Sequence, residues 1–170
     1  MIKRLTYFIS LLILPSITLA QHSLSFDGLG EPGMTDGDYV YVANDASLNF
    51  TTNQSYTLSA WFKVDELPTH SSGSWVFKKE YSSNTGVYGI KIQSGGTMHV
   101  YITQNTSLSG PIIALGQWYH VLIKKAYAAG NAKLYINGSY MGSSSTSNHG
   151  YSAGELIIGA QDFSGNVSEI

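Results

Sequence analysis

The chain has 170 residues and no cysteine, and its length and apolar content suit one globular domain. Only 12% of its residues are charged, well below the usual share, with 9 Lys and Arg against 11 Asp and Glu. This composition excludes coiled coils, disulfide scaffolds and cysteine-based zinc or redox chemistry, and it argues against nucleic-acid binding by phosphate neutralisation.

The first twenty residues have the pattern of a secretory signal peptide. Lys3 and Arg4 precede the apolar run Leu5–Leu14, and small residues follow. The whole apolar stretch is shorter than the about 20 residues that a membrane span needs. We therefore expect residues 1–20 to be removed on export. Residues 21–170 then form one secreted or surface-exposed domain without a membrane span, in which seven lysines face eleven acids.

Beyond the signal peptide, apolar residues alternate with a period of two, which is typical of strands. Clusters of Gly, Ser and Asn separate the alternating runs, as in antiparallel sandwiches. Only Asp45–Leu48 suggests a helical turn. The predicted strands cover residues 23–26, 39–42, 56–64, 74–79, 87–93, 97–103, 118–124, 133–136, 139–141 and 155–158. The sequence thus predicts an all-β protein.

Two of the predicted connections are tight turns. Asn137-Gly138 separates two strands by two residues, which is the strongest short-range signal for a hairpin with positive φ at both positions. Gly95-Gly96 joins the strands at 87–93 and 97–103 in a similar way.

Each predicted strand has one aliphatic face and one face that mixes aromatic and polar residues, because side chains alternate across a strand. Trp61, His99 and Tyr101 lie on mixed faces. Such a face suits sugars, since aromatic rings stack on the C–H faces of a pyranose while neighbours form hydrogen bonds. The alternative is an ordinary solvated outer sheet, because scattered exposed aromatic residues are common.

Several segments, in this order, resemble laminin G-like (LamG-like), concanavalin A-like jelly-roll domains. The resemblance extends over nearly all of residues 23–170 and implies two antiparallel sheets, one of them concave, and a role in carbohydrate recognition or adhesion. The segments are Leu24–Gly28, Asp38–Val42, Tyr56–Lys63, Gln117–Val121, Lys133–Gly138, Leu156–Ala160 and Phe163–Gly165.

The end of the chain departs from the family pattern. Such domains usually close with a strand that reads Gly-x-Ile-Asp-Glu-Val, whereas Gly165–Ile170 replaces the Asp by Ser168 and then stops. We therefore expect the final strand to be truncated, which leaves a sheet edge exposed.

The pattern of acids argues against catalysis. Retaining glycosidases need two carboxylates about 5–5.5 Å apart, and a Glu-x-Asp-x-x-Glu run along a strand would supply them. The eleven acids form no such run, and no Gly-x-Ser-x-Gly motif is present. We expect no enzymatic activity.

A calcium ion is a further expectation. Asp27 ends the first predicted strand and Asp162 precedes the closing strand, and the resemblance implies that these strands pair. Their carboxylates would then meet at one rim and offer the oxygen ligands that Ca²⁺ prefers. The alternative is that both residues cap turns. The histidines lack zinc-site spacing.

The sequence therefore predicts a non-catalytic module that binds glycan through Trp61, His99 and Tyr101 on the concave sheet, or through rim loops at 81–86 and 142–150. One alternative is an adhesion or structural module that binds extracellular protein partners. A glycan hydrolase is a third reading.

Overall fold

The computed structural model describes residues 23–26, 39–50, 54–68, 71–82, 85–103, 106–126, 131–145 and 154–161. They form strands only, apart from one 3₁₀ turn, η1 (Ala46–Leu48), that the side chain of Asp45 caps. This confirms the all-β class. The strands are β1 (Val40–Val42), β2 (Tyr56–Lys63), β3 (Ser74–Ser82), β4 (Thr85–Ile92), β5 (Thr97–Thr103), β6 (Thr106–Ile112), β7 (Trp118–Lys125), β8 (Asn131–Ile136), β9 (Ser139–Ser145) and β10 (Leu156–Gln161).

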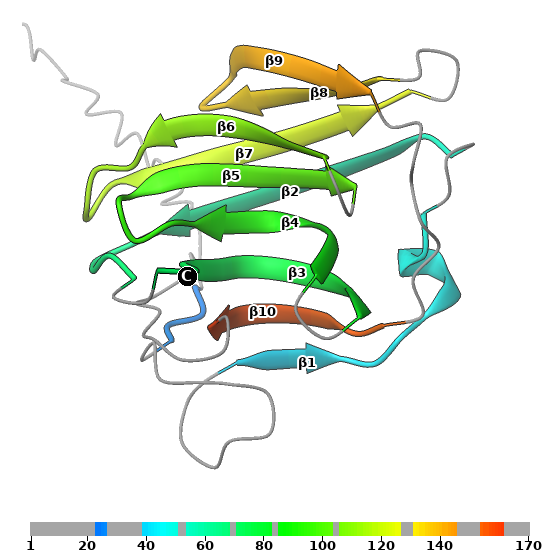
Figure 1. The fold of residues 1–170 in the computed structure, drawn as a ribbon, viewed down its shortest axis with the longest axis horizontal. Helices are drawn as coiled ribbons and strands as arrows, with labels where there is room; N and C mark the ends of the chain where they lie inside the picture. Colours follow the sequence, from blue (N-terminus) through cyan, green and yellow to red (C-terminus); the bar gives the residue numbers. More distant parts are fainter. Residues whose placement is uncertain are drawn as a thin grey trace, which may run out of the picture.

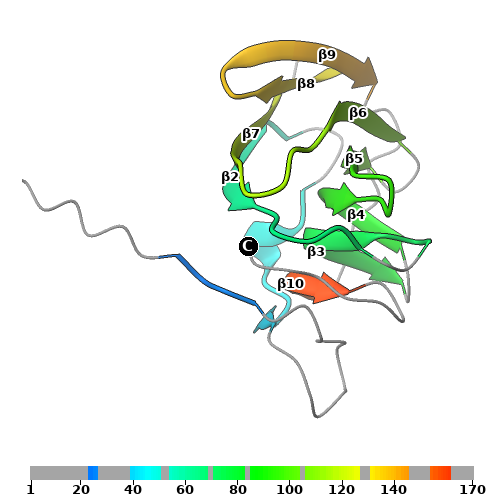
Figure 2. The same cartoon turned by 90° about the vertical axis from the view of Figure 1, so that its left-hand side faces the viewer.

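The strands form the two antiparallel sheets that the sequence predicts (Figure 1). One sheet has six strands in the order β1-β10-β3-β4-β5-β6, and the other has four in the order β2-β7-β8-β9. Figure 2 shows the four-stranded sheet arching over the six-stranded one, so that β9 comes to lie beside β6. At the other edge of the four-stranded sheet, β2 is the last strand among the described residues.

The aliphatic faces of both sheets form the core between them. Phe62, Met98, Val100, Ile102 and Leu134 are fully buried. Ile90 and Ile92 from β4, and Val121 and Ile123 from β7, join the same cluster. Alternation therefore assigned the inward faces correctly, and it follows that the mixed faces point away from the core.

The hairpin at Asn137-Gly138 is confirmed. Asn137 has φ 49° and Gly138 φ 78°, and Asn tolerates this left-handed region better than most residues. The turn joins β8 to β9, with Ile136 opposite Ser139. The turn at Gly95-Gly96 is confirmed as well, with Gly96 at φ 78°.

The structure differs from the prediction in three segments. β6 was not predicted, because Thr106–Ile112 is rich in Ser and contains Gly110-Pro111 rather than alternating apolar residues. Residues 23–26 form no strand and pair with none among the described residues. The rim loops are shorter than predicted, since residues 81–82 and 85–86 belong to β3 and β4, and residues 142–145 to β9.

Residues 1–20 and 163–170, on which the predictions of a signal peptide and a truncated strand rest, lie outside the described residues. In the part of the chain that the structure describes, no helix has the length and hydropathy for crossing a membrane.

Candidate functional site

The outer face of the four-stranded sheet carries an aromatic and polar surface. On β2, Phe62 points into the core, so its neighbour Trp61 points outward and is 63% exposed. The register of β2 and β7 places Trp61 directly opposite His120. Their rings stack with centroids 4.8 Å apart and an interplanar angle of 26°. Trp61 therefore presents a wide indole face to solvent from a fixed position.

His120 is itself held by two neighbouring strands. Its Nε2 lies 2.8 Å from Oγ of Ser59 on β2. Its backbone N–H donates to Oδ1 of Asn137 over 2.8 Å, and its carbonyl accepts from the backbone N–H of Asn137. The tight turn that Asn137 begins thus anchors the residue on which Trp61 stacks.

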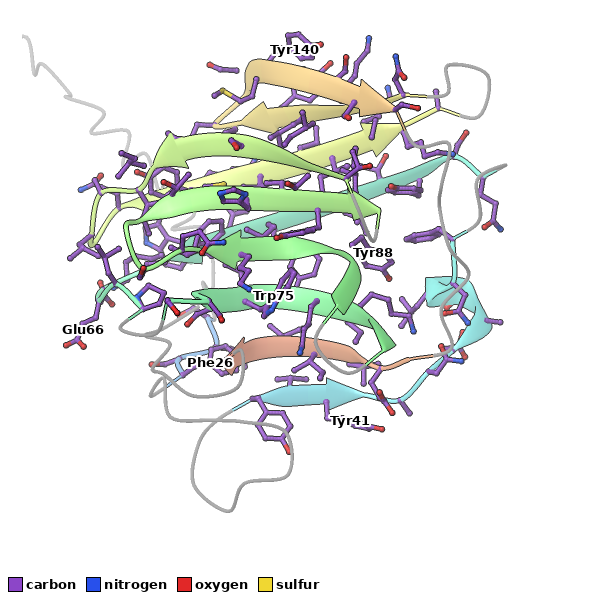
Figure 3. The ribbon with its side chains drawn as sticks, viewed as in Figure 1. Phe26, Tyr41, Glu66, Trp75, Tyr88 and Tyr140 are labelled. Atoms are coloured by element: carbon purple, nitrogen blue, oxygen red, sulfur yellow. The ribbon has the colours of Figure 1, made fainter. Side chains whose placement is uncertain are left out.

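Further aromatic residues extend this surface along the strands. Tyr135 on β8 lies opposite Tyr140 on β9, and their ring centroids are 5.6 Å apart. Trp118 lies opposite Lys63 at the other side of Trp61 and is 47% exposed. We call the surface formed by Ser59, Trp61, Trp118, His120, Tyr135 and Tyr140 the aromatic face. Tyr140 is labelled in Figure 3.

The structure does not bring the three predicted ligand-binding residues together. His99 and Tyr101 lie on β5 of the six-stranded sheet, whereas Trp61 lies on the four-stranded sheet. Since Val100 on β5 points into the core, His99 and Tyr101 face outward on the opposite side of the sandwich. The prediction of one shared face was therefore wrong, because alternation gives the face within a strand but not the sheet.

The surroundings of His99 and Tyr101 offer less exposed ring area. Both side chains are half-buried. Tyr101 packs against Trp75 with centroids 5.0 Å apart, and Trp75 is only 2% exposed. The Nζ of Lys91 lies 5.0 Å from the centre of the Trp75 ring. This cluster on β3, β4 and β5 packs mainly on itself, and the aromatic face is the better candidate.

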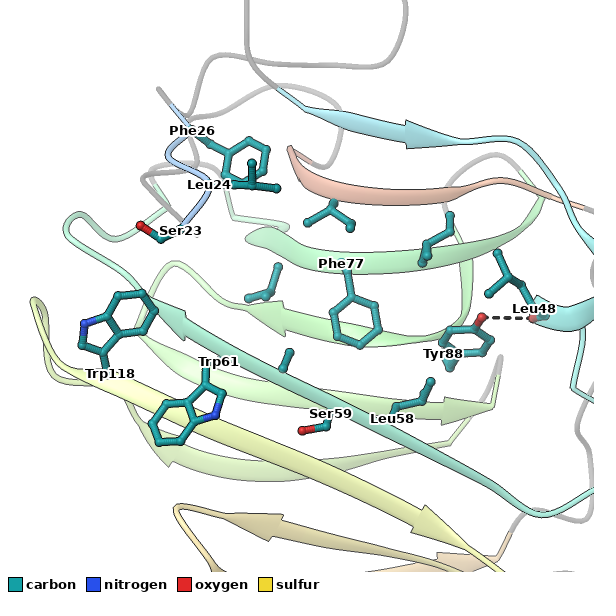
Figure 4. Close-up of a pocket in the computed structure, with 14 residues that line it drawn as sticks. Ser23, Leu24, Phe26, Leu48, Leu58, Ser59, Trp61, Phe77, Tyr88 and Trp118 are labelled. Atoms are coloured by element: carbon teal, nitrogen blue, oxygen red, sulfur yellow. Dashed lines mark hydrogen bonds between the residues drawn. The ribbon is translucent and has the colours of Figure 1, made fainter. Parts of the chain in front are cut away.

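A groove of about 1000 Å³ opens along the free edge of β2, between the two sheets (Figure 4). Its lining is mostly apolar and includes Leu58, Phe77 and Ile158. Trp61 and Trp118 lie toward its outer side. Ser59 supplies one of its few hydroxyls. The groove is therefore lined mainly by apolar side chains, unlike a polar sugar pocket. It adjoins the aromatic face at the edge of β2.

Two buried tyrosines donate hydrogen bonds near the core, and one of them, Tyr88, lines the groove. The hydroxyl of Tyr88 donates to the carbonyl of Leu48 over 3.0 Å, and burial raises the pKa of Tyr88 to about 12. The hydroxyl of Tyr56 donates to the carbonyl of Ile102, and burial raises the pKa of Tyr56 as well. Neither hydroxyl ionises near neutral pH, so both act as structural donors.

The predicted calcium ligands Asp27 and Asp162 lie outside the described residues. Within the described ranges, no group of three or more His, Asp or Glu side chains could hold a metal ion. Phe26, the residue before Asp27, packs against Gly159, which lies three residues before Asp162 in the sequence.

Sequence reasoning found Trp61 but missed most of its partners. Nothing in the sequence alone groups His120 and Ser59 with Trp61. The pairing of β2 with β7 is what makes them one unit, and residues 59 and 120 are 61 positions apart. Tyr135 and Tyr140 carried a local signal, since they flank the predicted hairpin.

The sequence matches the family model of the concanavalin A-like lectin/glucanases superfamily over residues 34–169. The chain belongs to this superfamily. The match extends over most of the chain and agrees with the two antiparallel sheets, so the predicted family is confirmed. No curated protein matches the sequence.

Solved structures with the same fold include proteins from several sources. A proposed carbohydrate-binding protein from Bacteroides ovatus has a TM-score of 0.57 at 15% identity, over 85% of this chain and 41% of that one. Botulinum neurotoxin type C, whose cell entry depends on two ganglioside molecules, has a TM-score of 0.54 at 16% identity, over 86% and 34%. The sialidase of Trypanosoma rangeli has a TM-score of 0.51 at 17% identity, over 69% and 19%.

The present chain thus spans less than half the length of each of these three proteins. At these identities the likeness concerns the fold.

Proposed function

We propose that this protein is a secreted, non-catalytic carbohydrate-binding module and that it binds saccharides on the aromatic face. The superfamily and the carbohydrate-binding neighbours of the same fold support a carbohydrate ligand. The apolar N-terminal run after Lys3 and Arg4 supports export.

The stacking of Trp61 on His120 is the observation that carries the proposal. An exposed indole normally loses side-chain entropy when a ligand fixes it. Here the ring is already held by His120, which Ser59 and Asn137 hold in turn. A preorganised aromatic ring with hydroxyl and imidazole groups beside it suits a sugar ring, which presents an apolar face and polar edges.

Three described carboxylates that have structural partners support the absence of catalysis. Asp65 forms an ion pair with Lys63 at 2.8 Å, Asp45 caps η1, and Glu155 accepts a hydrogen bond from the hydroxyl of Tyr41. Each of these acids has a structural partner, and none lies in the strands that carry the aromatic face.

The predicted calcium ion stays part of the proposal. Phe26 and Gly159 are in contact, and Asp27 and Asp162 follow them closely in the sequence. Carboxylates attached near one point suit Ca²⁺. We expect Ca²⁺ to raise the melting temperature, and the double variant D27N/D162N to remove this effect.

A glycan panel tests the proposal with two matched variants. We expect the wild-type protein to bind at least one saccharide class, and Trp61→Ala to weaken that binding about tenfold or more, as is typical of a central aromatic anchor. Tyr41→Ala is the control, because Tyr41 is 55% exposed but lies on β1 of the other sheet.

Three results would contradict the proposal. Binding that Trp61→Ala leaves unchanged would move the site away from the aromatic face. Binding to an extracellular protein with no glycan bound would favour the adhesion module. Hydrolysis of a panel member would make the protein an enzyme.

A further inference from the structure

The four-stranded sheet is free of acidic residues. Neither residues 46–64 nor residues 81–154 contain Asp or Glu, and these two segments include all of β2, β7, β8 and β9. The same strands carry Lys63, Lys124, Lys125 and Lys133. The chain as a whole has more acids than bases, so this sheet has a net positive charge within a chain of net negative charge.

Two of these lysines face each other, and no described residue in their row carries a counter-charge. The register of β7 and β8 places Lys124 directly opposite Lys133. Both side chains are exposed on the outer face, and directly opposed residues have β-carbons only about 5 Å apart. Like charges at such a pair destabilise a sheet. The neighbours in the same cross-strand row are Thr57 and Ser143, which carry no charge.

The other two lysines of the sheet are engaged. Lys63 forms its ion pair with Asp65. Lys125 is buried and donates from Nζ to the carbonyl of Gln54 over 2.8 Å. The opposed pair is therefore the part of this sheet where positive charge is presented to solvent.

The lysine pair is continuous with the aromatic face. His120 and Lys124 are four residues apart on β7 and lie on the same side, a separation of about 13 Å along the strand. The Tyr135–Tyr140 pair lies in the row between them. One extended ligand can therefore stack on Trp61, pass the tyrosines and reach the two ammonium groups.

We infer that the ligand of the aromatic face is an acidic polysaccharide, whose carboxylate or sulfate groups bind between Lys124 and Lys133. This inference rests on the proposed function and names its ligand class. An anion between the two ammonium groups would turn their repulsion into two charge-assisted contacts. Carboxylated and sulfated sugars share this chemistry.

The test compares three polymers at low ionic strength: polygalacturonate, dextran sulfate and neutral dextran. We expect at least one acidic polymer to bind about tenfold more tightly than dextran, and its affinity to fall with added salt. The double variant K124Q/K133Q is expected to lose about tenfold in affinity for that polymer, since two exposed charge contacts are removed. K124R/K133R keeps the charges and is expected to keep the binding. Melting temperatures of both variants confirm folding.

The outcomes separate the inference from the proposed function. In one outcome, saccharides bind and Trp61→Ala weakens their binding, but K124Q/K133Q does not change the affinity for the acidic polymers, or dextran binds most tightly. The inferred acidic ligand is then wrong, while the proposed carbohydrate-binding function stands. If poly-glutamate binds as tightly as the acidic polymers and Trp61→Ala has no effect, the surface attracts any polyanion and the inference fails. If no saccharide binds at all, the proposed function fails with it.

Discussion

The ring of Phe26 lies directly over the α-carbon of Gly159. A β-carbon at Gly159 would come within 2.4 Å of Phe26 Cδ1, and Gly159 has φ +74°. Phe26 is 4% exposed as a result. The contact docks the segment before β1 onto β10, and glycine is required there both by the backbone angle and by the ring.

We expect Gly159→Ala to lower the free energy of unfolding by about 2–3 kcal/mol, because the new methyl group displaces Phe26 and the left-handed backbone is strained. Urea unfolding measures this. Gly95→Ala is the control, since its β-carbon would meet nothing within 4 Å. Equal stability of the Gly159→Ala variant and the wild type would show that Phe26 is not docked as described.

Lys79 ties three segments together at the other end of the sandwich. Its side chain is fully buried, and Nζ donates to Oδ1 of Asn44 over 2.7 Å and to the carbonyl of Gly154. Burial lowers the pKa of Lys79, and the nearby charges of Glu155 and Asp45 offset part of this decrease. The ammonium group thus bridges the ends of β1, β3 and β10.

We expect Lys79→Ala to cost about 2–4 kcal/mol in unfolding free energy, because it removes both the buried stem and the hydrogen bonds. Lys79→Met keeps most of the stem and should cost less. Chemical denaturation at neutral pH measures both variants. A Lys79→Ala variant as stable as Lys124→Ala, which changes an exposed lysine, would contradict the bridging role.

Tyr88 makes stability sensitive to alkaline pH. Its pKa is raised from 10.0 to about 12 in the folded protein by burial. Above pH 10 the unfolded chain loses this proton while the folded protein keeps it. The contribution of Tyr88 is therefore complete below pH 10 and is lost as the pH rises toward 12.

We expect Tyr88→Phe to flatten the loss of stability between pH 10 and 12 and to cost about 1 kcal/mol at neutral pH, where it removes the bond to the Leu48 carbonyl. Urea midpoints against pH measure this for variant and wild type. Because Tyr88 also raises the pKa of Tyr56, the difference between the two curves reports Tyr88 together with its effect on Tyr56. Parallel curves for the two proteins would contradict the assignment.

The sequence was sufficient to predict which face of each strand is buried, but not which strands lie next to one another in a sheet. Alternation placed Phe62, Val100 and Ile123 inward, because a period of two fixes which side of a strand is buried. It could not place Trp61 and His99 on different sheets, because the strand order is set by contacts between distant segments. β6 was missed because Ser-rich edge strands need little apolar alternation.

The same holds for the candidate site: the sequence indicated a single residue but not the contacts that support it. Trp61 stood out because a large ring on a mixed face is visible in the sequence. Its support by His120, Ser59 and Asn137 depends on the pairing of β2, β7 and the β8–β9 turn. The opposed lysines appear only in the register of β7 and β8.

The central claim, that saccharides bind on the aromatic face, can be tested within one spectrum. The chain has three tryptophans. Trp61 and Trp118 lie at the aromatic face, whereas Trp75 is 2% exposed on the other sheet. Each indole N–H gives one signal in a ¹H–¹⁵N correlation spectrum, and the Trp61→Ala variant assigns the first.

During titration with a saccharide that binds, we predict that the Trp61 indole signal shifts most, that the Trp118 signal shifts less, and that the Trp75 signal stays in place. A saccharide that binds while only Trp75 shifts would place the site on the six-stranded sheet and contradict the account.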